Sequence, residues 1–217
     1  MSPNDLTQRS IYRMVHYENI EYILKNGMCC QSHPLADPNY IDIGYAKLIS
    51  QRKEYKVRID PPNGNFGDCV PFYFGGHSPM LLNIKTGERD ITRRPQEDIV
   101  FVCCKIFRIV YFCEAQWCFT DGHAKAKNSA YYNNVQELVK IDWQMVFEQW
   151  WRNTADDNDR ERRKQAEFLV KYYVPVNCFH GLLVKNQQRK EGVERIVTRL
   201  GLKIPVKADT NNQLFYP

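Results

Sequence analysis

Five polar residues lie at positions where a rigid scaffold could hold them for chemistry. Arg13 and His16 belong to one predicted strand, Arg52 follows a proline-rich loop, His123 follows a turn, and Glu167 starts another predicted strand. A carboxylate can stabilise a developing positive charge, and a guanidinium can hold a polar or anionic substrate in place. These residue types therefore indicate electrostatic catalysis or substrate clamping.

Each of these residues also has a structural interpretation. Glu167 could be an edge-strand charge that discourages aggregation, and Arg52 a solvated helix residue. His16 could cap a turn, and His123 could be exposed in one. Because single residues of this kind are weak evidence for a site, the pattern alone assigns no reaction.

Several common sites are missing from the sequence. It contains no phosphate-binding glycine motif, no nucleophile elbow and no H-E-x-x-H helix. Its eight cysteines include two adjacent pairs but no C-x-x-C spacing. We therefore expect reduced, packed thiols and no metal site.

The composition fits one globular domain spanning 1–217. The chain has 217 residues, of which 43% are apolar and 25% charged. Its longest apolar run, 99–113, is interrupted by Lys105 and Arg108 and is shorter than the roughly 20 residues of a membrane span. The N-terminus shows no secretory signal pattern, so we expect a cytoplasmic protein with no membrane partner.

The net charge of +5 is modest, but the basic residues are unevenly distributed. The segment 185–207 holds seven basic and two acidic residues, and smaller basic clusters lie at 52–58, 89–94 and 160–164. This distribution is compatible with a polyanionic partner, although solvated surfaces would look the same.

In the pattern predicted from hydrophobic periodicity, strands dominate the middle of the chain and helices flank them, which indicates the α+β class. Predicted strands are 10–16, 69–74, one or two within 99–112, one that begins at Glu167, and 182–185. Predicted helices are 18–26, 45–55, one beginning after Ser78, 143–152 and 187–200.

Local signals support several of these boundaries. Gly27 and Gly201 are predicted helix stops, while Ser78 and Asp142 are predicted N-caps. The segment 31–43 is predicted as an ordered loop, and the charged segment 153–164 as a surface loop or a frayed helix.

Five segments, taken in order, resemble the DarT family of bacterial DNA ADP-ribosyltransferase toxins. They span 11–170, and VPFYF…SPML together with KQAEFL are the most specific. The matching residues are IYRMVH (11–16) with Asn19 and 23–24, Tyr45 and Ala46 with Arg52, VPFYF (70–74) with SPML (78–81), 119–121 with His123, and KQAEFLV (164–170).

The resemblance implies an ADP-ribosyltransferase fold, similar to that of the poly(ADP-ribose) polymerases, in which NAD binds between two halves of a split mixed or antiparallel sheet. It also implies transfer of ADP-ribose from NAD to a base of single-stranded DNA, with release of nicotinamide. The base is thymine in the better-matching branch and guanine in another. Because the leaving group is a cationic pyridinium, the enzyme must stabilise an oxocarbenium-like transition state.

The resemblance also implies the roles of individual residues. Glu167 would accept a hydrogen bond from a ribose hydroxyl. Arg52, in an NAD-binding loop of about 36–58, would clamp the cofactor and the base, or alternatively accept the proton that the base loses. The first strand would hold the nicotinamide amide through its backbone. The implied NAD contacts are Arg13, Met14, Val15, Tyr22, Cys30, Arg52, Tyr73, Met80 and His123.

DNA would enter along a recognition loop of about 119–166. Base stacking is expected from Trp150, Trp151, Tyr131 and Tyr132, and phosphate contacts from Arg160, Arg162, Arg163 and Lys164. The alternative for Trp150 is a core position, which its helical spacing from Val146 favours.

The family further implies a toxin that is restrained by a DarG-type macrodomain antitoxin. Two other functions stay open. The same transferase could act on RNA or protein, or the chain could bind nucleic acid without catalysis, through its basic C-terminal helix and its tryptophans.

Overall fold

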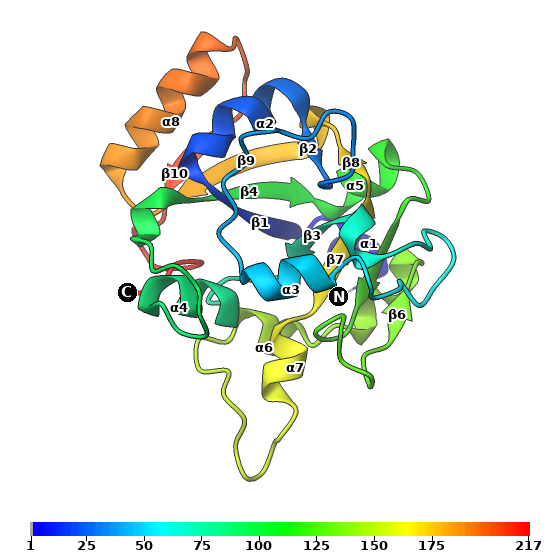
Figure 1. Cartoon of the computed structure of the whole chain (residues 1–217). Helices are drawn as coiled ribbons and strands as arrows, with labels where there is room; N and C mark the ends of the chain where they lie inside the picture. Colours follow the sequence, from blue (N-terminus) through cyan, green and yellow to red (C-terminus); the bar gives the residue numbers. More distant parts are fainter. Residues whose placement is uncertain (1) are drawn as a thin grey trace.

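A mixed eight-stranded sheet organises the computed structural model, which describes residues 2–217 (Figure 1). The strand order is β10-β9-β4-β1-β3-β7-β5-β6, and a short second sheet pairs β2 with β8. The strands are β1 Ser10–His16, β2 Met28–Cys29, β3 Cys69–Tyr73, β4 Ile99–Lys105, β5 Trp117–Thr120, β6 Tyr131–Tyr132, β7 Glu167–Lys171, β8 Tyr173–Val174, β9 Phe179–Val184 and β10 Val206–Ala208. The α+β class predicted from the sequence is confirmed.

Short helices flank the sheet. The α-helices are α1 Pro3–Thr7, α2 Ile20–Asn26, α3 Ala46–Gln51, α4 Pro79–Thr86, α5 Ile106–Phe112, α6 Trp143–Phe147, α7 Arg160–Lys164 and α8 Gln187–Arg199. The 3₁₀ helices are η1 Tyr17–Asn19, η2 Phe66–Asp68, η3 Gln96–Asp98, η4 Val135–Lys140 and η5 Val176–Cys178. Within residues 2–217, none of the helices has the length and apolar character needed to cross a bilayer.

Both faces of the central strands are buried. Alternate residues of β1 and β4 pack into different clusters, as the two-residue period of a strand requires. Val15 and Val102 belong to the cluster covered by α2, α5 and α8, whereas Met14 and Phe101 pack with α4 and the C-terminal Phe215. In Figure 1, α2 and α8 accordingly lie together on one side of these strands and α4 on the other.

The sheet is split between β1 and β3. Strand β1 pairs with β4 along seven residues, but with β3 it pairs at one position, Tyr12 opposite Tyr73. Beyond this position, the side chain of Arg13 reaches across the gap and its Nη1 donates to the carbonyl of Pro71 at 3.3 Å. The N–H and C=O of one strand residue point to the same edge of the strand. Because the carbonyl of Pro71 faces the split, the N–H that proline lacks would also face it, where no strand accepts a hydrogen bond.

The predicted helix caps are confirmed. Ser78 accepts from the N–H of Leu81 at the start of α4, and Asp142 accepts from the N–H of Met145 in α6. Gly27 ends α2 with a φ of 81°. All eight cysteines are free thiols, and six of them are buried.

Three predicted elements were wrong in part. The second half of 99–112 forms helix α5, because Ile106 and Ile109 point inward at helical spacing while Phe107 is exposed. The helix predicted for 143–152 ends at Phe147. The strand that begins at Glu167 breaks at Tyr172, whose φ of 62° ends the alternation and passes the chain to the second sheet.

Candidate active site

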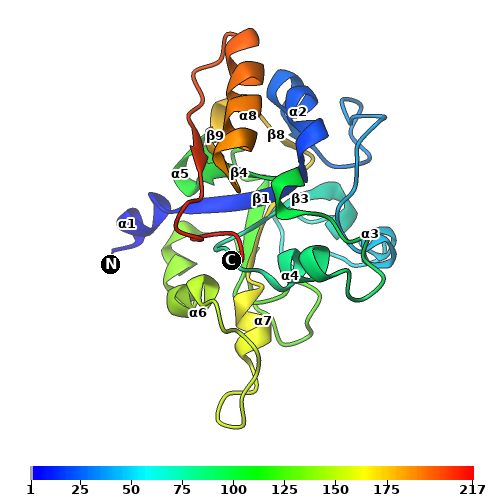
Figure 2. The same cartoon turned by 90° about the vertical axis from the view of Figure 1, so that its left-hand side faces the viewer.

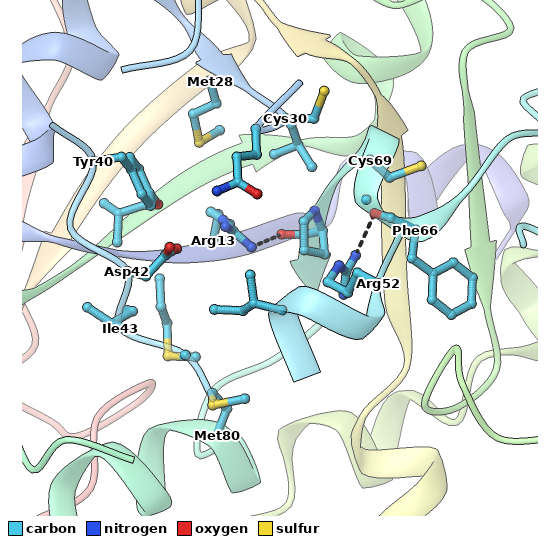
Figure 3. A pocket seen from close by; sticks show the side chains of 18 of the residues that line it. Arg13, Met28, Cys30, Tyr40, Asp42, Ile43, Arg52, Phe66, Cys69 and Met80 are labelled. Atoms are coloured by element: carbon cyan, nitrogen blue, oxygen red, sulfur yellow. Dashed lines mark hydrogen bonds between the residues drawn. The ribbon is translucent and has the colours of Figure 1, made fainter. Parts of the chain in front are cut away.

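A cavity of about 690 Å³ opens at the split in the sheet (Figure 3). Its volume lies within the range of small-molecule sites, about 300–1,000 Å³. Its walls come from the edge of β1, the segment 22–45, the end of α3, the middle of β3, and α4. In Figure 3, Met28 and Cys30 line one side, Met80 the opposite side, and Arg13 and Arg52 lie between them.

Glu167, the first residue of β7, is held by hydrogen bonds to Thr120 and Ala124, at the end of β5 and in the turn after it. The residue is 6% exposed. Its Oε1 accepts from the N–H of Ala124 at 3.0 Å, and its own N–H donates to Thr120 Oγ1 at 3.2 Å. The Thr120 hydroxyl donates in turn to the carbonyl of Gly122 at 2.6 Å. One carboxylate oxygen is thereby fixed.

The other carboxylate oxygen lies beside Arg52. Arg52 Nη1 is 3.8 Å from Glu167 Oε2, and Arg52 Nη2 donates to the carbonyl of Phe66 at 3.3 Å. The guanidinium also lies 5.8 Å from the centre of the Phe66 ring. At 3.8 Å the two charges attract without a close hydrogen bond, so both remain available to a ligand in the cavity.

Tyr73 adds a neutral hydroxyl next to this pair. It lies directly opposite Glu167 across the β3–β7 ladder. Burial, together with the negative charge of Glu167, raises the pKa of Tyr73. The phenol is therefore protonated at neutral pH and can donate a hydrogen bond.

All residues that the sequence implied for NAD contacts line this cavity together with Glu167, as one surface. They are Arg13, Met14, Val15, Tyr22, Cys30, Arg52, Tyr73, Met80 and His123. Beyond Tyr12, one edge of β1 has no strand beside it, so the backbone groups on that edge of the segment 13–15 face the split.

The two histidines differ. His123 lines the cavity, and its Nδ1 accepts from the N–H of Lys125 at 3.1 Å. His16 does not line it. Its ring accepts from the N–H of Glu18 and caps η1, and burial lowers its pKa. The structural interpretation of His16 is therefore confirmed.

The cavity also includes residues that sequence reasoning missed. Lys125 and Gln165 line the cavity and lie two positions along the chain from His123 and Glu167 respectively. Phe66 and the N–H of Ala124 contribute through backbone atoms, and their contribution has no signal in the residue type.

The charges of the lining are mostly positive. Five basic side chains face three acidic ones, Arg13, Arg52, Lys53, Arg89 and Lys125 against Asp37, Asp42 and Glu167. A dinucleotide with a pyrophosphate fits this balance. Among residues 2–217, no group of His, Cys, Asp or Glu side chains is arranged to hold a metal ion.

Of the two adjacent tryptophans, Trp150 is exposed to solvent and Trp151 is buried. Trp150 is 79% exposed where the chain leaves α6 for the loop that projects toward α7 (Figure 2), so a core position for it was wrong. Trp151 is buried, and its indole N–H donates to the hydroxyl of Tyr216 at 2.8 Å. A stacking role for Trp151 is therefore wrong, because its ring is packed inside the protein.

Tyr131 and Tyr132 are half-buried against protein rings. Tyr131 stacks beside Phe66 and its hydroxyl donates to the carbonyl of Ala124 at 2.7 Å. Tyr132 packs beside Phe119, with ring centres 5.4 Å apart. Each ring is therefore already in contact with another ring on the protein.

Most basic side chains of the run 160–164 are engaged in ion pairs and hydrogen bonds within the protein. Arg162 donates to Asp159 and Asp121, and Arg163 pairs with Asp142 and Asp157. Because these guanidinium groups are already paired with carboxylates, the phosphate contacts predicted for Arg162 and Arg163 are wrong. Both residues form structural ion pairs instead.

Lys164 and Arg160 complete the run. Lys164 is buried, and its Nζ donates to the carbonyls of Val146 and Glu148 at 2.9 and 2.6 Å, so its predicted phosphate contact is wrong. These bonds cap the carbonyl end of α6. Arg160 is half-buried and donates to the carbonyls of Trp150 and Arg152.

Comparisons with known proteins agree over nearly the whole chain. A family model described as DarT, ssDNA thymidine ADP-ribosyltransferase, matches residues 12–216. A DNA ADP-ribosyl transferase of Escherichia coli O127:H6 is 34% identical over 196 residues, which cover 90% of this chain and 89% of that protein.

Two solved structures of Thermus sp. 2.9 DarT have the same fold. The complex with ADP-ribosylated ssDNA has a TM-score of 0.85 and 27% identity, and the match covers 96% of this chain and 97% of that one. The complex with NAD+ has a TM-score of 0.79 and 26% identity, with coverage of 96% and 98%.

The buried Lys164 predicts a pH dependence of stability. Burial lowers its pKa to about 7, against the opposing charge of Glu148. An unfolded lysine titrates at about pH 10.4, so between these values the unfolded chain binds a proton that the folded chain does not. The unfolding free energy therefore rises with pH between about 7 and about 10, and this gain is lost again as the pH falls back to about 7.

We expect Lys164→Met to lose this dependence. The wild-type unfolding free energy should rise from pH 7 to 9 relative to that of the variant, by at most about 1.4 kcal/mol per pH unit. Urea denaturation at pH 6.5, 7.5 and 8.5 measures it, with the exposed Lys207→Met as control. Parallel curves for wild type and Lys164→Met would contradict the assignment.

Proposed function

The chain belongs to the DarT family of ssDNA thymidine ADP-ribosyltransferases, and from this we propose that Glu167 and Arg52 transfer ADP-ribose from NAD+ to a thymine base of single-stranded DNA. The observation that carries the assignment is their meeting in one cavity, with Glu167 fixed by the Ala124 N–H and Arg52 at 3.8 Å from it.

Glu167 matches the charge that the reaction develops. The bond between the ribose carbon and the pyridinium nitrogen breaks, its electron pair leaves with nicotinamide, and positive charge builds up on the sugar. A carboxylate held from a strand can accept a hydrogen bond from a ribose hydroxyl and stabilise that charge. The sugar carbon then bonds to a nitrogen of the base, which releases its proton to solvent water.

Arg52 acts as a clamp rather than a base. Guanidinium groups stay protonated at neutral pH, so they donate hydrogen bonds and cannot accept a proton. Arg52 is oriented by the carbonyl and ring of Phe66 and reaches the same space as Glu167. From there it can hold the dinucleotide and the incoming base in line.

The open edge of β1 is suited to the nicotinamide amide. An amide has one acceptor and two donor hydrogens, and an unpaired strand edge offers both complementary groups regardless of side chain. Because the Arg13 side chain is bonded to Pro71, its contribution there is through the backbone.

The DNA strand approaches past Trp150. The Trp150 ring is exposed, and the Arg160 side chain donates hydrogen bonds to the carbonyls of Trp150 and Arg152 beside it. The projecting loop carries the exposed carboxylate of Asp156, which repels phosphates. Stacking on Trp150 together with the nearby arginines is therefore a better path than the tip of the loop.

The catalytic assignment predicts the behaviour of Glu167→Gln. This variant keeps the shape but loses the negative charge, so transfer to a mixed single-stranded oligonucleotide should fall by at least about 100-fold. Labelled NAD+ reports the transfer, and mass analysis of recovered nucleosides identifies the base. Glu191→Gln, at an exposed position of α8, is the matched control.

Different outcomes separate the competing functions. Label on thymidine with wild type and control alone supports the proposal. Label on guanosine, RNA or protein instead would reject the thymine assignment, and DNA binding without transfer by wild type would reject catalysis.

The DNA path predicts that Trp150→Ala weakens binding of single-stranded DNA. Loss of one base-stacking face costs about 1–3 kcal/mol, so the Kd should rise roughly 5- to 150-fold while the KM for NAD+ is unchanged. Fluorescence anisotropy measures the Kd. Tyr111→Ala removes an equally exposed aromatic from α5, at 76% exposure, and should leave it unaltered. Equal Kd values for Trp150→Ala and wild type would exclude this path.

We also propose that the enzyme is a toxin restrained by a DarG-type macrodomain antitoxin, as the family resemblance supports. Production of the wild-type chain in bacteria should arrest growth, whereas Glu167→Gln should not. Co-production of a DarG-type macrodomain should restore growth and remove ADP-ribose from DNA. Growth arrest that persists with the modification removed, or no arrest at all, would argue against the proposal.

A further inference from the structure

The segment 121–130 is a closed loop that carries the hydrogen-bond donor to Glu167. Its ends meet where the N–H of Ala130 donates to Asp121 Oδ1 at 2.9 Å. Within it, the N–H of Ala124 donates to Glu167 Oε1. The position of the carboxylate therefore depends on the shape of this loop.

Arg58 organises the loop from outside the cavity. Its Nη1 donates to the carbonyl of Lys127 at 2.9 Å. Its Nη2 donates to the carbonyls of Ala126 at 2.7 Å, Ser129 at 3.1 Å and Ala124 at 3.4 Å. The guanidinium also lies 4.7 Å from the centre of the Tyr131 ring, whose hydroxyl bonds the same Ala124 carbonyl.

Four carbonyl dipoles that converge on one point repel each other unless a cation lies between them. A planar guanidinium supplies that charge and has enough N–H groups to reach several carbonyls from one position. A lysine would supply the charge with a different, less fixed set of donors. The loop conformation is therefore held better by an arginine at this position than by a lysine.

The backbone around Arg58 is anchored independently of its side chain. The N–H of Val57 donates to the carbonyl of Gly64 at 2.9 Å, and Lys56 bridges to Asn65. Removal of the guanidinium should therefore release the loop 121–130 while the segment that carries Arg58 stays in place. Arg58 does not line the cavity, so it acts through Glu167 and not on the ligand.

We propose that Arg58 is a positioning residue for ADP-ribose transfer, which shapes the loop 121–130 so that the Ala124 N–H stays aimed at Glu167. The proposal rests on the proposed function of Glu167. It joins the two parts of the active site, because the chain that supplies Arg52 also supplies, six residues later, the side chain that fixes the carboxylate.

The experiment compares Arg58→Met and Arg58→Lys with wild type. Misplacement of a catalytic group by about 1 Å can lower the rate roughly 100-fold. We therefore expect Arg58→Met to lower kcat about 10- to 100-fold with the KM for NAD+ within about threefold of wild type, and Arg58→Lys to restore part of the rate. Arg199→Met, an exposed arginine on α8 whose side chain is 62% exposed, is the matched control.

Two further measurements separate positioning from stability. Arg58 is exposed to solvent, so methylguanidinium should enter the gap in Arg58→Ala and raise its kcat, and it should leave Arg199→Met unchanged. Amide hydrogen exchange at 123–129 should be faster in Arg58→Met than in wild type, with β1 and β4 unaffected.

The outcomes distinguish this proposal from the proposed function. If wild type transfers no ADP-ribose to DNA, the proposed function fails, and hydrogen exchange alone then decides the role of Arg58 in the loop. If wild type is active, an unchanged kcat in Arg58→Met, a lowered Tm with unchanged kcat, or no rescue by methylguanidinium each overturns the proposal. A lowered kcat with rescue and faster exchange supports it.

Discussion

The active site depends on one strand pairing that the sheet leaves unmade. β1 and β3 meet at Tyr12 and Tyr73 and then separate, while their outer neighbours β4 and β7 stay fully paired. The separation gives a cavity inside a sheet whose other strands are rigid. It also leaves a row of backbone donors and acceptors without a strand partner, which is costly unless water or a ligand binds them.

The sequence maintains this separation with two residues. Pro71 cannot donate from the edge of β3 that faces β1, so the ladder cannot close at this point. Arg13 then bonds the carbonyl that Pro71 leaves exposed and spans the gap. The split is therefore built into the sequence, and ligand entry need not break a formed ladder.

The carboxylate of Glu167, at the start of β7, is held by partners from distant segments. The N–H of Ala124 donates to Glu167 Oε1, and Arg52 lies 3.8 Å from Oε2, so both carboxylate contacts come from residues outside β7 and β3. Arg52 stays at 3.8 Å because Phe66 holds its other end. A shorter ion pair would satisfy both charges internally and leave neither for a substrate.

These distances explain what could be predicted from sequence. The strand start at Glu167 and the caps at Ser78 and Asp142 depend on nearby residues, and periodicity found them. The meeting of Glu167 with Arg52 depends on tertiary structure, so only the family resemblance indicated it. The second half of 99–112 was missed because a mostly apolar run looks the same in the sequence whether it forms a buried strand or a buried helix.

The errors near the DNA path have a related cause. Helical spacing placed Trp150 inward, but α6 ends at Phe147, where Lys164 bonds its last carbonyls, and the change of phase turns Trp150 outward and Trp151 inward. The run 160–164 was interpreted as phosphate ligands because the sequence shows its charges but not their partners. Once Arg162 and Arg163 are paired with aspartates, the run 160–164 itself offers little free positive charge to a DNA backbone. An exposed ring next to a neutralised basic run is better suited to the stacking proposed for Trp150 than to recognition by charge.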